Sequence, residues 1–278
     1  MTYATIHLHL TPYPAPTSMA AIDYACAMAK LLEANIDASS SQLSIRAPGN
    51  WLTGAMMAKM ARELEITTAE TTAALESHLE IEALASGIEM KLTRISEHWP
   101  MGVLDNSWRT RTSDICVLGL SALGTDARLG IEDWLFGAGR PCLLYPDKSK
   151  QLFSIDDVLI CWDFSRSAAR TVADALPLLH NAKRIRIAIF RGEKDIPIEG
   201  AGNHLVKYLA SHGITAKAEE IDIGDHTIGQ AILAHASTSA VDMILMGAYG
   251  HSRMREFFLG GATKEVLDTS TIPLLMSH

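Results

Sequence analysis

The fold is decided by residues 242–263, with the sequence DMILMGAYGHSRMREFFLGGAT. Its first part is continuously apolar, as expected of a strand that is buried on both faces of a parallel sheet. The apolar run ends at Gly247 and Gly250 follows three residues later, so the backbone after the strand can approach a ligand closely. The pair Gly260 and Gly261 opens an apolar helical pattern, where free N–H groups and the positive end of the helix dipole favour an anion. The stretch therefore predicts a strand, a phosphate-type anion site and a helix.

The spacing of these glycines resembles the nucleotide-binding motif of the universal stress protein family, Gly-x2-Gly-x9-Gly-(Ser/Thr). Gly247, Gly250 and Gly260 fall on its three glycines, and the run GAYGHSRMREF that follows the strand is itself similar to the family. The fourth position departs from the motif, because Gly261 stands where the family's nucleotide binders have Ser or Thr. A hydroxyl donor to phosphate is therefore missing there. The candidates to replace it are Ser252, Thr263 and the N–H of Gly261.

This resemblance implies that the second half of the chain binds ATP or a related adenine nucleotide, together with Mg²⁺. It implies that Asp163, at the end of an apolar run, lies near the ribose or a bridging metal. The residues after it, Phe164 and Ser165, look like the family's Asp-Gly-Ser turn with Phe in place of Gly. Arginines of the glycine loop would neutralise phosphate charge. The expected nucleotide-binding residues are Asp163, Gly247, Gly250, Arg253, Gly260, Gly261 and Thr263.

Each of these residues also has an interpretation that needs no ligand. Asp163 is suited to cap the helix that follows it, and the glycines are suited to the turns and helix start of the fold itself. Arg253 and Arg255 are equally typical of a solvated loop. The chain has no P-loop, no GxGxxG in a first βα turn and no GxSxG motif. No general base for hydrolysis stands out, so we expect no catalytic residues and at most slow ATP hydrolysis.

The histidines and cysteines do not predict a metal centre. His7 and His9 alternate on one predicted strand and share a face, but two residues do not make a site, and the sequence has no HExxH or CxxC motif. We therefore expect no bound structural metal. The four cysteines are expected to be buried, reduced thiols of a cytoplasmic protein: Cys26, Cys116, Cys142 and Cys161.

Charge and hydropathy exclude two classes of partner. The 278 residues carry a formal net charge of −8, and residues 1–147 hold most of it, with 17 acids against 10 bases. Residues 148–278 hold 15 acids and 14 bases, so this half accommodates an anion more easily. Nucleic-acid binding requires a basic footprint, which the first half lacks. No apolar run approaches the length of a membrane span and no secretory signal is seen, so we expect a cytoplasmic protein without a membrane partner.

The apolar pattern predicts two tandem copies of one α/β unit. In the second copy, apolar strands alternate with helical segments, which is typical of a doubly wound parallel sheet. Its predicted strands are 158–162, 185–190, 214–223, 243–246 and 272–276, and its predicted helices are 167–179, 203–211, 228–240 and 257–269. The first copy repeats this outline, with strands 6–10, 35–45, 88–95, 114–120 and 141–145, helices 18–32 and 131–137, and one or two helices over 56–85. The fold class is thus two tandem Rossmann-like, five-stranded parallel domains of universal-stress type, 1–147 and 152–278.

The first copy has lost the nucleotide motif. Gly119 is not followed by a second glycine at the family's spacing, and the first strand runs into Thr11 where the second copy has Asp163. By resemblance, the two copies pack as an intramolecular counterpart of the family's dimer, along residues 142–145 and 272–276. A homodimer of the whole chain is a further expectation.

Three functions are compatible with these features. The favoured one is a tandem universal stress protein that binds ATP in its second copy and acts in stress response or regulation, with a protein partner that the sequence does not identify. The alternative is a nucleotide-free dimerisation or interaction module with a decayed site, for which Phe164 and Gly261 are the signals. The third is an enzyme of the related adenine-nucleotide-hydrolase-like fold, which the missing catalytic constellation disfavours.

Overall fold

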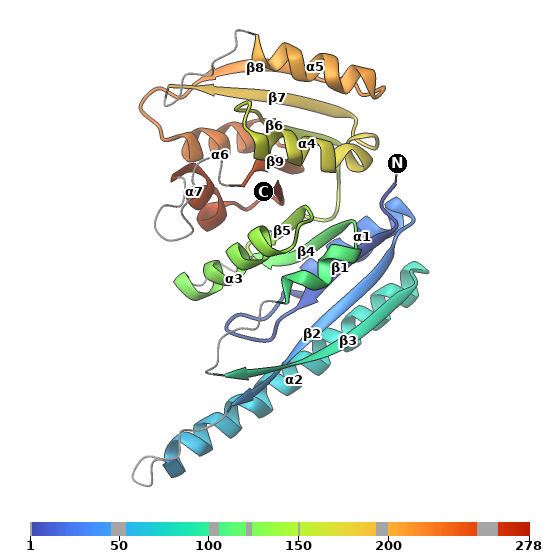
Figure 1. Ribbon diagram of the computed structural model, residues 1–278, viewed down its shortest axis with the longest axis vertical. Helices are drawn as coiled ribbons and strands as arrows, with labels where there is room; N and C mark the ends of the chain where they lie inside the picture. The colour runs from blue at the N-terminus through green and yellow to red at the C-terminus, as the bar shows by residue number, and fades with distance from the viewer. Residues whose placement is uncertain are drawn as a thin grey trace.

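The computed structural model describes residues 2–45, 54–99, 106–120, 124–149, 151–192, 200–248 and 261–278. Within these ranges the chain forms ten strands and seven α-helices, which alternate along the sequence and build one continuous sheet (Figure 1). Among these residues no helix combines the length and the apolar character that crossing a membrane requires.

The N-terminal half contains five strands and three α-helices. The strands are β1 (Thr5–Leu10), β2 (Asn35–Ile45), β3 (Met90–Trp99), β4 (Ile115–Leu120) and β5 (Cys142–Pro146). The helices are α1 (Met19–Leu32), α2 (Gly54–Ser86) and α3 (Gly124–Gly137), with a 3₁₀ helix, η1 (Ser107–Thr112), between β3 and β4. The five predicted strands are confirmed, and the ambiguous segment 56–85 is a single helix. The 3₁₀ helix has no counterpart in the prediction.

The C-terminal half contains five strands and four α-helices. The strands are β6 (Asp157–Cys161), β7 (Arg184–Arg191), β8 (Lys217–Asp222), β9 (Met243–Gly247) and β10 (Leu274–Ser277). The helices are α4 (Arg166–Leu179), α5 (Ala201–Ser211), α6 (Ile228–Thr238) and α7 (Gly261–Thr269). All of these elements were predicted, and the polar strand β8 lies at the sheet edge as expected.

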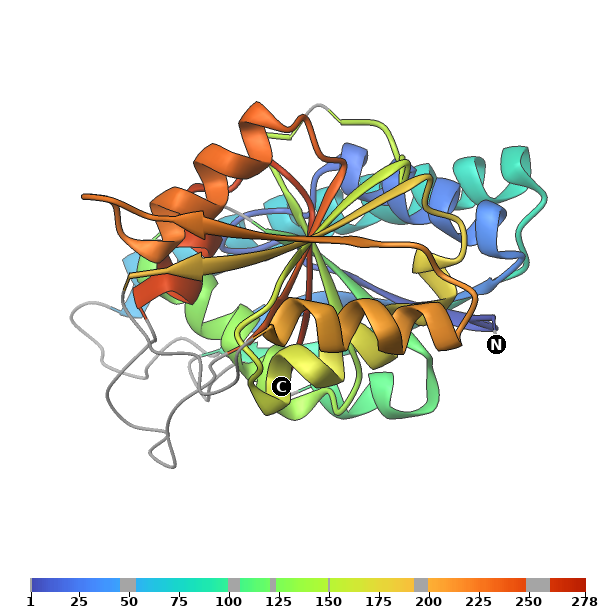
Figure 2. The same ribbon diagram turned by 90° about the horizontal axis from the view of Figure 1, so that it is seen from above.

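The two halves meet edge to edge in one sheet with the order β3-β2-β1-β4-β5-β10-β9-β6-β7-β8. All pairings within each half are parallel, whereas β5 and β10 pair antiparallel, with Leu144 opposite Leu274 and Cys142 opposite Met276. This confirms the predicted pairing along the last strand of each copy. Viewed along the stack of strands, the sheet fans out through its twist (Figure 2).

Equivalent hydrogen bonds show that the two halves are copies of one unit. Asp114 precedes β4, and its Oδ2 accepts from the backbone N–H of Thr5, at 3.0 Å. Asp242 precedes β9, and its Oδ2 accepts from the N–H of Asp157 in the same way, at 2.9 Å. Thr5 and Asp157 are therefore equivalent positions. Counting along the two strands places Thr11 at the position of Asp163.

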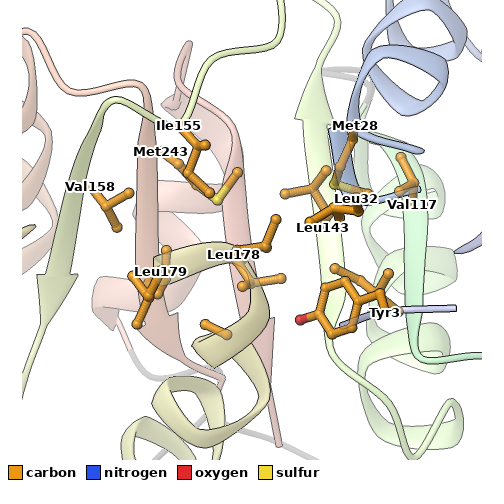
Figure 3. Close-up of a cluster of buried hydrophobic side chains, with 14 of the residues drawn as sticks. Tyr3, Met28, Leu32, Val117, Leu143, Ile155, Val158, Leu178, Leu179 and Met243 are labelled. Carbon is orange, nitrogen blue, oxygen red and sulfur yellow. The ribbon is translucent and has the colours of Figure 1, made fainter. Parts of the chain in front are cut away.

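The helices cover both faces of the sheet and enclose two apolar clusters. Helices α1, α2, α4 and α5 bury their apolar side chains on one face, and α3, α6 and α7 on the other. The first cluster continues across the junction of the halves, where Val117 and Leu143 lie opposite Leu178 and Met243 (Figure 3). The hydroxyl of buried Tyr3 donates to the carbonyl of Asp174 at 2.5 Å, which ties the N-terminus to α4. The halves thus share one core on this side of the sheet.

Candidate functional site

The predicted site lies at the carboxyl ends of β6 and β9, the usual ligand-binding edge of an open α/β sheet. These strands are neighbours, and Cys161 of β6 stands opposite Met246 of β9. Asp163 and Gly247 come directly after these positions, so the structure brings them to the same edge on adjacent strands. Helix α4 begins between them, with its N-terminus against the end of β9.

Asp163 and Ser165 form the entry to α4. Oδ1 of exposed Asp163 accepts from the N–H of Ser165 at 2.9 Å, and Oγ of Ser165 accepts from the N–H of Ala168 at 3.1 Å. Ser165 is therefore the N-cap, as predicted, and Asp163 closes the turn that precedes it. The carboxylate of Asp163 has a structural role that requires no ligand, and it still lies exposed at the strand end.

Phe164 occupies a backbone conformation that suits glycine. Its φ is 61°, in the left-handed region, where a side chain costs about 1–2 kcal/mol. This explains why the similar turn of the universal stress protein family has glycine at this position. The phenyl ring is 37% exposed, and its centroid lies 5.6 Å from the ring of Trp162 and 6.4 Å from that of His204. Part of the backbone cost is thereby offset by aromatic contact.

Gly247 is required by packing at the end of β9. A Cβ at this position would lie 2.6 Å from the backbone nitrogen of Ala168 and 2.6 Å from Oγ of Ser167. Both contacts are far shorter than van der Waals distance, so only glycine lets α4 begin so close to the strand. The close approach predicted for Gly247 is thus real, and the group that approaches it is the helix.

A buried hydroxyl that the sequence analysis did not single out holds this edge together. Oγ1 of Thr171 accepts from the N–H of Ser277 at 3.0 Å and lies 3.2 Å from the carbonyl oxygen of Met246 and 2.9 Å from that of Ser167. It joins α4 to the ends of β9 and β10. The available sequence signal is weak, because a Thr four residues after a Ser is common in helices.

Gly261 leaves open space at the start of α7. It is exposed, and among the described residues, which exclude 249–260, no atom lies within 4 Å of a Cβ placed there. Thr263 is only 6% exposed, on the face of α7 that packs on the sheet. The remaining predicted residues, Gly250, Arg253 and Gly260, lie outside the described residues, as do Ser252 and Arg255.

A groove of about 310 Å³ runs between the start of α6 and the outer face of α7. Its lining includes Gly261 and one cation, Lys264, but also the two carboxylates of Glu265 and Asp268. Glu265 also accepts a hydrogen bond from Thr227 at the N-cap of α6. With two acids against one base, the part of the groove away from Gly261 suits a phosphate poorly.

The thiol at the end of β6 is inert. Burial raises the pKa of Cys161, and the nearby charge of Asp163 raises it further. All four cysteines of the chain are buried and free, as the sequence predicts. A buried thiol with a raised pKa is a poor nucleophile and a poor metal ligand.

The equivalent region of the N-terminal half contains two histidines in place of apolar residues. Oγ of Ser39 lies 3.0 Å from Nε2 of His7 and 2.9 Å from Nδ1 of His9, and both rings lie beside Trp134 of α3. Burial lowers the pKa of His7 to about 4 and that of His9 to about 3. Both histidines are therefore neutral at pH 7. The two side chains share a face, as predicted, and they share one serine.

The sequence of the C-terminal half is similar to a known protein family. Residues 155–278 match the model of the universal stress protein family. A 147-residue stretch is 29% identical to universal stress protein Slr1230 of Synechocystis sp., and the match covers 49% of this chain and 46% of that protein. This chain therefore spans less than half the length of that curated relative.

Solved structures share the whole fold. A universal stress protein from Archaeoglobus fulgidus superposes with a TM-score of 0.67 over 97% of this chain and 94% of that one, at 18% identity. The cytoplasmic domain of a prokaryotic cation chloride cotransporter superposes with a TM-score of 0.53 over 100% of this chain and 96% of that one, at 13% identity. At these identities the likeness establishes the fold alone. The family-model match identifies residues 155–278 as a universal stress protein domain, and the solved structures show that the whole chain shares the fold of such proteins.

Proposed function

We propose that the C-terminal half binds ATP or a related adenine nucleotide, with Mg²⁺, and that the protein acts in stress response or regulation rather than in catalysis. The nucleotide would lie at the edge where β6 and β9 end, with its phosphates toward the start of α7. The expected contacts are Asp163 with the ribose or the metal, and Arg253 with the phosphates. Gly247, Gly250, Gly260, Gly261 and Thr263 would complete the site.

One observation carries the proposal: the sheet edge brings Asp163 and Gly247 together on neighbouring strands, while Gly261 opens α7 into free space. A phosphate needs hydrogen-bond donors that no side chain covers. The free backbone N–H groups at an uncovered helix N-terminus are such donors. Among the described residues no atom lies within 4 Å of a Cβ at Gly261, which fits a group placed against the backbone there. Universal stress proteins with Ser or Thr at this position would donate one further hydrogen bond.

The test is an ATP titration followed by thermal unfolding, with a matched pair of aspartate variants. Asp163 lies two residues after the end of β6 and Asp222 is the last residue of β8, and both accept a hydrogen bond from the N–H two residues later, at 2.9 and 3.0 Å. Asp163→Ala and Asp222→Ala therefore lose the same kind of turn. We expect Mg–ATP to stabilise the wild type and Asp222→Ala at one site, by about 2.7 kcal/mol at one hundred times Kd. Stabilisation of Asp163→Ala should be lost or much reduced.

Two outcomes would contradict the proposal. Equal stabilisation of both variants would remove Asp163 from the site. No stabilisation of the wild type at millimolar ATP would support the alternative, a nucleotide-free interaction module. The tight packing of α4 on Gly247 and the engaged carboxylate of Asp163 favour that alternative, because both residues are explained without a ligand.

The setting of the protein follows from the same proposal. We place it in the cytoplasm, without a nucleic-acid partner, and with the boundary of its two domains between residues 147 and 152. Within the chain the two copies already pair through β5 and β10, so a homodimer would use another surface. Steady ATP turnover that disappears in Asp163→Ala would instead indicate an enzyme.

A further inference from the structure

Three potential metal ligands meet between helices α1 and α2, which lie side by side on one face of the N-terminal half (Figure 1). Asp23 projects from α1, and His78 and Glu82 project from α2. His78 and Glu82 are four residues apart, so they lie on the same face of their helix. Asp23 precedes the two ligands of α2 by at least 55 positions in the sequence, which is why no sequence motif revealed the cluster.

The ligand atoms are close enough to share one ion. Nε2 of His78 lies 2.6 Å from Oδ1 of Asp23, and one ligand atom from each of the three residues lies within 4.8 Å of the other two. All three side chains are at least partly accessible, so an ion can reach them from solvent. Around a Zn²⁺ ion with bonds of about 2.0–2.1 Å, ligand atoms are separated by little more than 3 Å, a distance these side chains reach by small rotations.

The charges around this cluster are not balanced by the protein. His78 pairs with Asp23, but within the described ranges no hydrogen bond or ion pair engages the carboxylate of Glu82. Burial raises the pKa of the Cys26 thiol to about 12, and the negative charges of Glu82 and Asp23 contribute to this rise. Both carboxylates therefore lie close to the same thiol. Two carboxylates facing one imidazole leave a site that a divalent cation would neutralise.

We propose that Asp23, His78 and Glu82 bind a divalent transition-metal ion, of which Zn²⁺ is the best match. One imidazole nitrogen and two carboxylate oxygens are ligands that Zn²⁺ accepts, and a water molecule completes four-coordination at a site open to solvent. The ion joins the middle of α1 to the C-terminal part of α2. It thereby fixes the helix that extends farthest from the sheet in Figure 1. This site is independent of the nucleotide site, which belongs to the other half of the chain.

The experiment measures Zn²⁺ binding to the full-length chain by calorimetry, after a chelator has removed any bound metal. Glu82→Gln is the decisive variant, because a simple His78–Asp23 ion pair does not involve Glu82. His78→Ala removes the nitrogen ligand. The matched control is His235→Ala, since His235 lies 3.1 Å from Glu219 in a pair of the same kind that has no third ligand among the residues the structure describes. Circular dichroism confirms that each variant is folded.

We expect one Zn²⁺ per chain in the wild type and in His235→Ala. Affinity should fall at least about tenfold in Glu82→Gln and further in His78→Ala. Bound Co²⁺ should give the visible absorption of a four-coordinate site in the wild type and lose it in both variants. An unchanged Zn²⁺ affinity in Glu82→Gln would overturn the proposal, and so would an equal loss in His235→Ala. A negative result here leaves ATP binding by the other half unaffected, so the two proposals fail separately.

Discussion

The same layer of the sheet is polar in one half of the molecule and apolar in the other. The hydrogen bonds of Asp114 and Asp242 show which positions of the two halves are equivalent. In the N-terminal half this layer is formed by His7, His9, Ser39 and Ser41. The equivalent residues of the C-terminal half are Leu159, Cys161, Ala188 and Phe190. In the C-terminal half this layer belongs to an apolar cluster with residues of α6. In the N-terminal half, the described part of the equivalent connection is the short helix η1.

The difference shows how a repeat keeps its topology while it changes its chemistry. In the described part of this connection no α-helix occupies the position of α6, and hydrogen bonds join His7, His9 and Ser39 on this face of the sheet. Such a layer is satisfied only while the imidazoles stay neutral. The same half also lacks the nucleotide motif, with Thr11 in place of Asp163.

The largest expected effect concerns acid. The folded-state pKa of His7 lies near 4, below the value of 6.5 for the free side chain, so below pH 6.5 the unfolded chain takes up the proton first. Stability is therefore full above pH 6.5 and is lost as the pH falls toward 4, by on the order of 3 kcal/mol for His7 alone. His7→Leu, which installs the residue type of the other half, should reduce the slope of unfolding free energy against pH by about half.

Denaturant unfolding at several pH values measures that slope. His212→Leu, at an exposed histidine, is the control and should leave the slope unchanged. An unaltered slope in His7→Leu would mean that the polar layer does not control acid stability.

Next in size is a comparison of two equivalent glycines. Gly247→Ala places a Cβ 2.6 Å from the backbone of Ala168, which should cost about 2–3 kcal/mol of stability and disturb the start of α4. Among the described residues, a Cβ in Gly119→Ala meets Thr17 at 3.6 Å and Oδ1 of Asp147 at 3.9 Å, both ordinary contacts, so we expect a change of under about 1 kcal/mol. Chemical denaturation of both variants checks the pair. Similar values would show that the two copies begin their first helices in the same way.

A smaller effect tests the nucleotide site itself. Gly261→Ser supplies the hydroxyl of the family motif into open space and should strengthen ATP binding about tenfold, or about 1.4 kcal/mol. Ala262→Ser, one residue further along α7, is the control and should leave affinity unchanged. Calorimetric titration with Mg–ATP gives both numbers. A serine at 261 that binds no better than glycine would place the phosphates elsewhere.

The smallest expected effect is that of Phe164→Gly. Glycine relieves the left-handed backbone, by about 1 kcal/mol, but it removes the ring contact with Trp162, worth a similar amount. We expect a net change in thermal stability of under about 1 kcal/mol. A large loss would show that the phenyl ring holds the α4–α5 face together.

Regular elements could be predicted from the sequence because their signals are local. Val158 to Cys161 is apolar on both faces of its strand, and Ser165 is a recognisable N-cap, so these assignments needed no tertiary information. The pairing of the two halves along their last strands was expected from the family resemblance, whereas the order of the strands within each half was not predicted. For the candidate site, the sequence predicted only that Asp163 and Gly247 lie at the same edge of the sheet. It did not show which other groups contact these two residues.

What the sequence missed depends on contacts between distant elements. Thr171 connects three elements through one oxygen, and its neighbours in the chain give no hint of this. The packing of α4 on Gly247 is likewise invisible in the sequence, since a turn glycine and a packing glycine look alike. The pairing of His78 with Asp23 requires knowing which helices are adjacent.

The antiparallel junction of β5 and β10 has a consequence for assembly. Each of these strands is fully buried and mostly apolar, and it would be a bare sheet edge if its half stood alone; such edges attract other chains. Strand β5 can pair in the same way with the β10 of its own chain or with the β10 of a second molecule. Two molecules that exchange halves would form a swapped dimer with every contact of this interface preserved, and pairing within one chain is favoured because the connection between Pro146 and Asp157 keeps the effective concentration of the second half high.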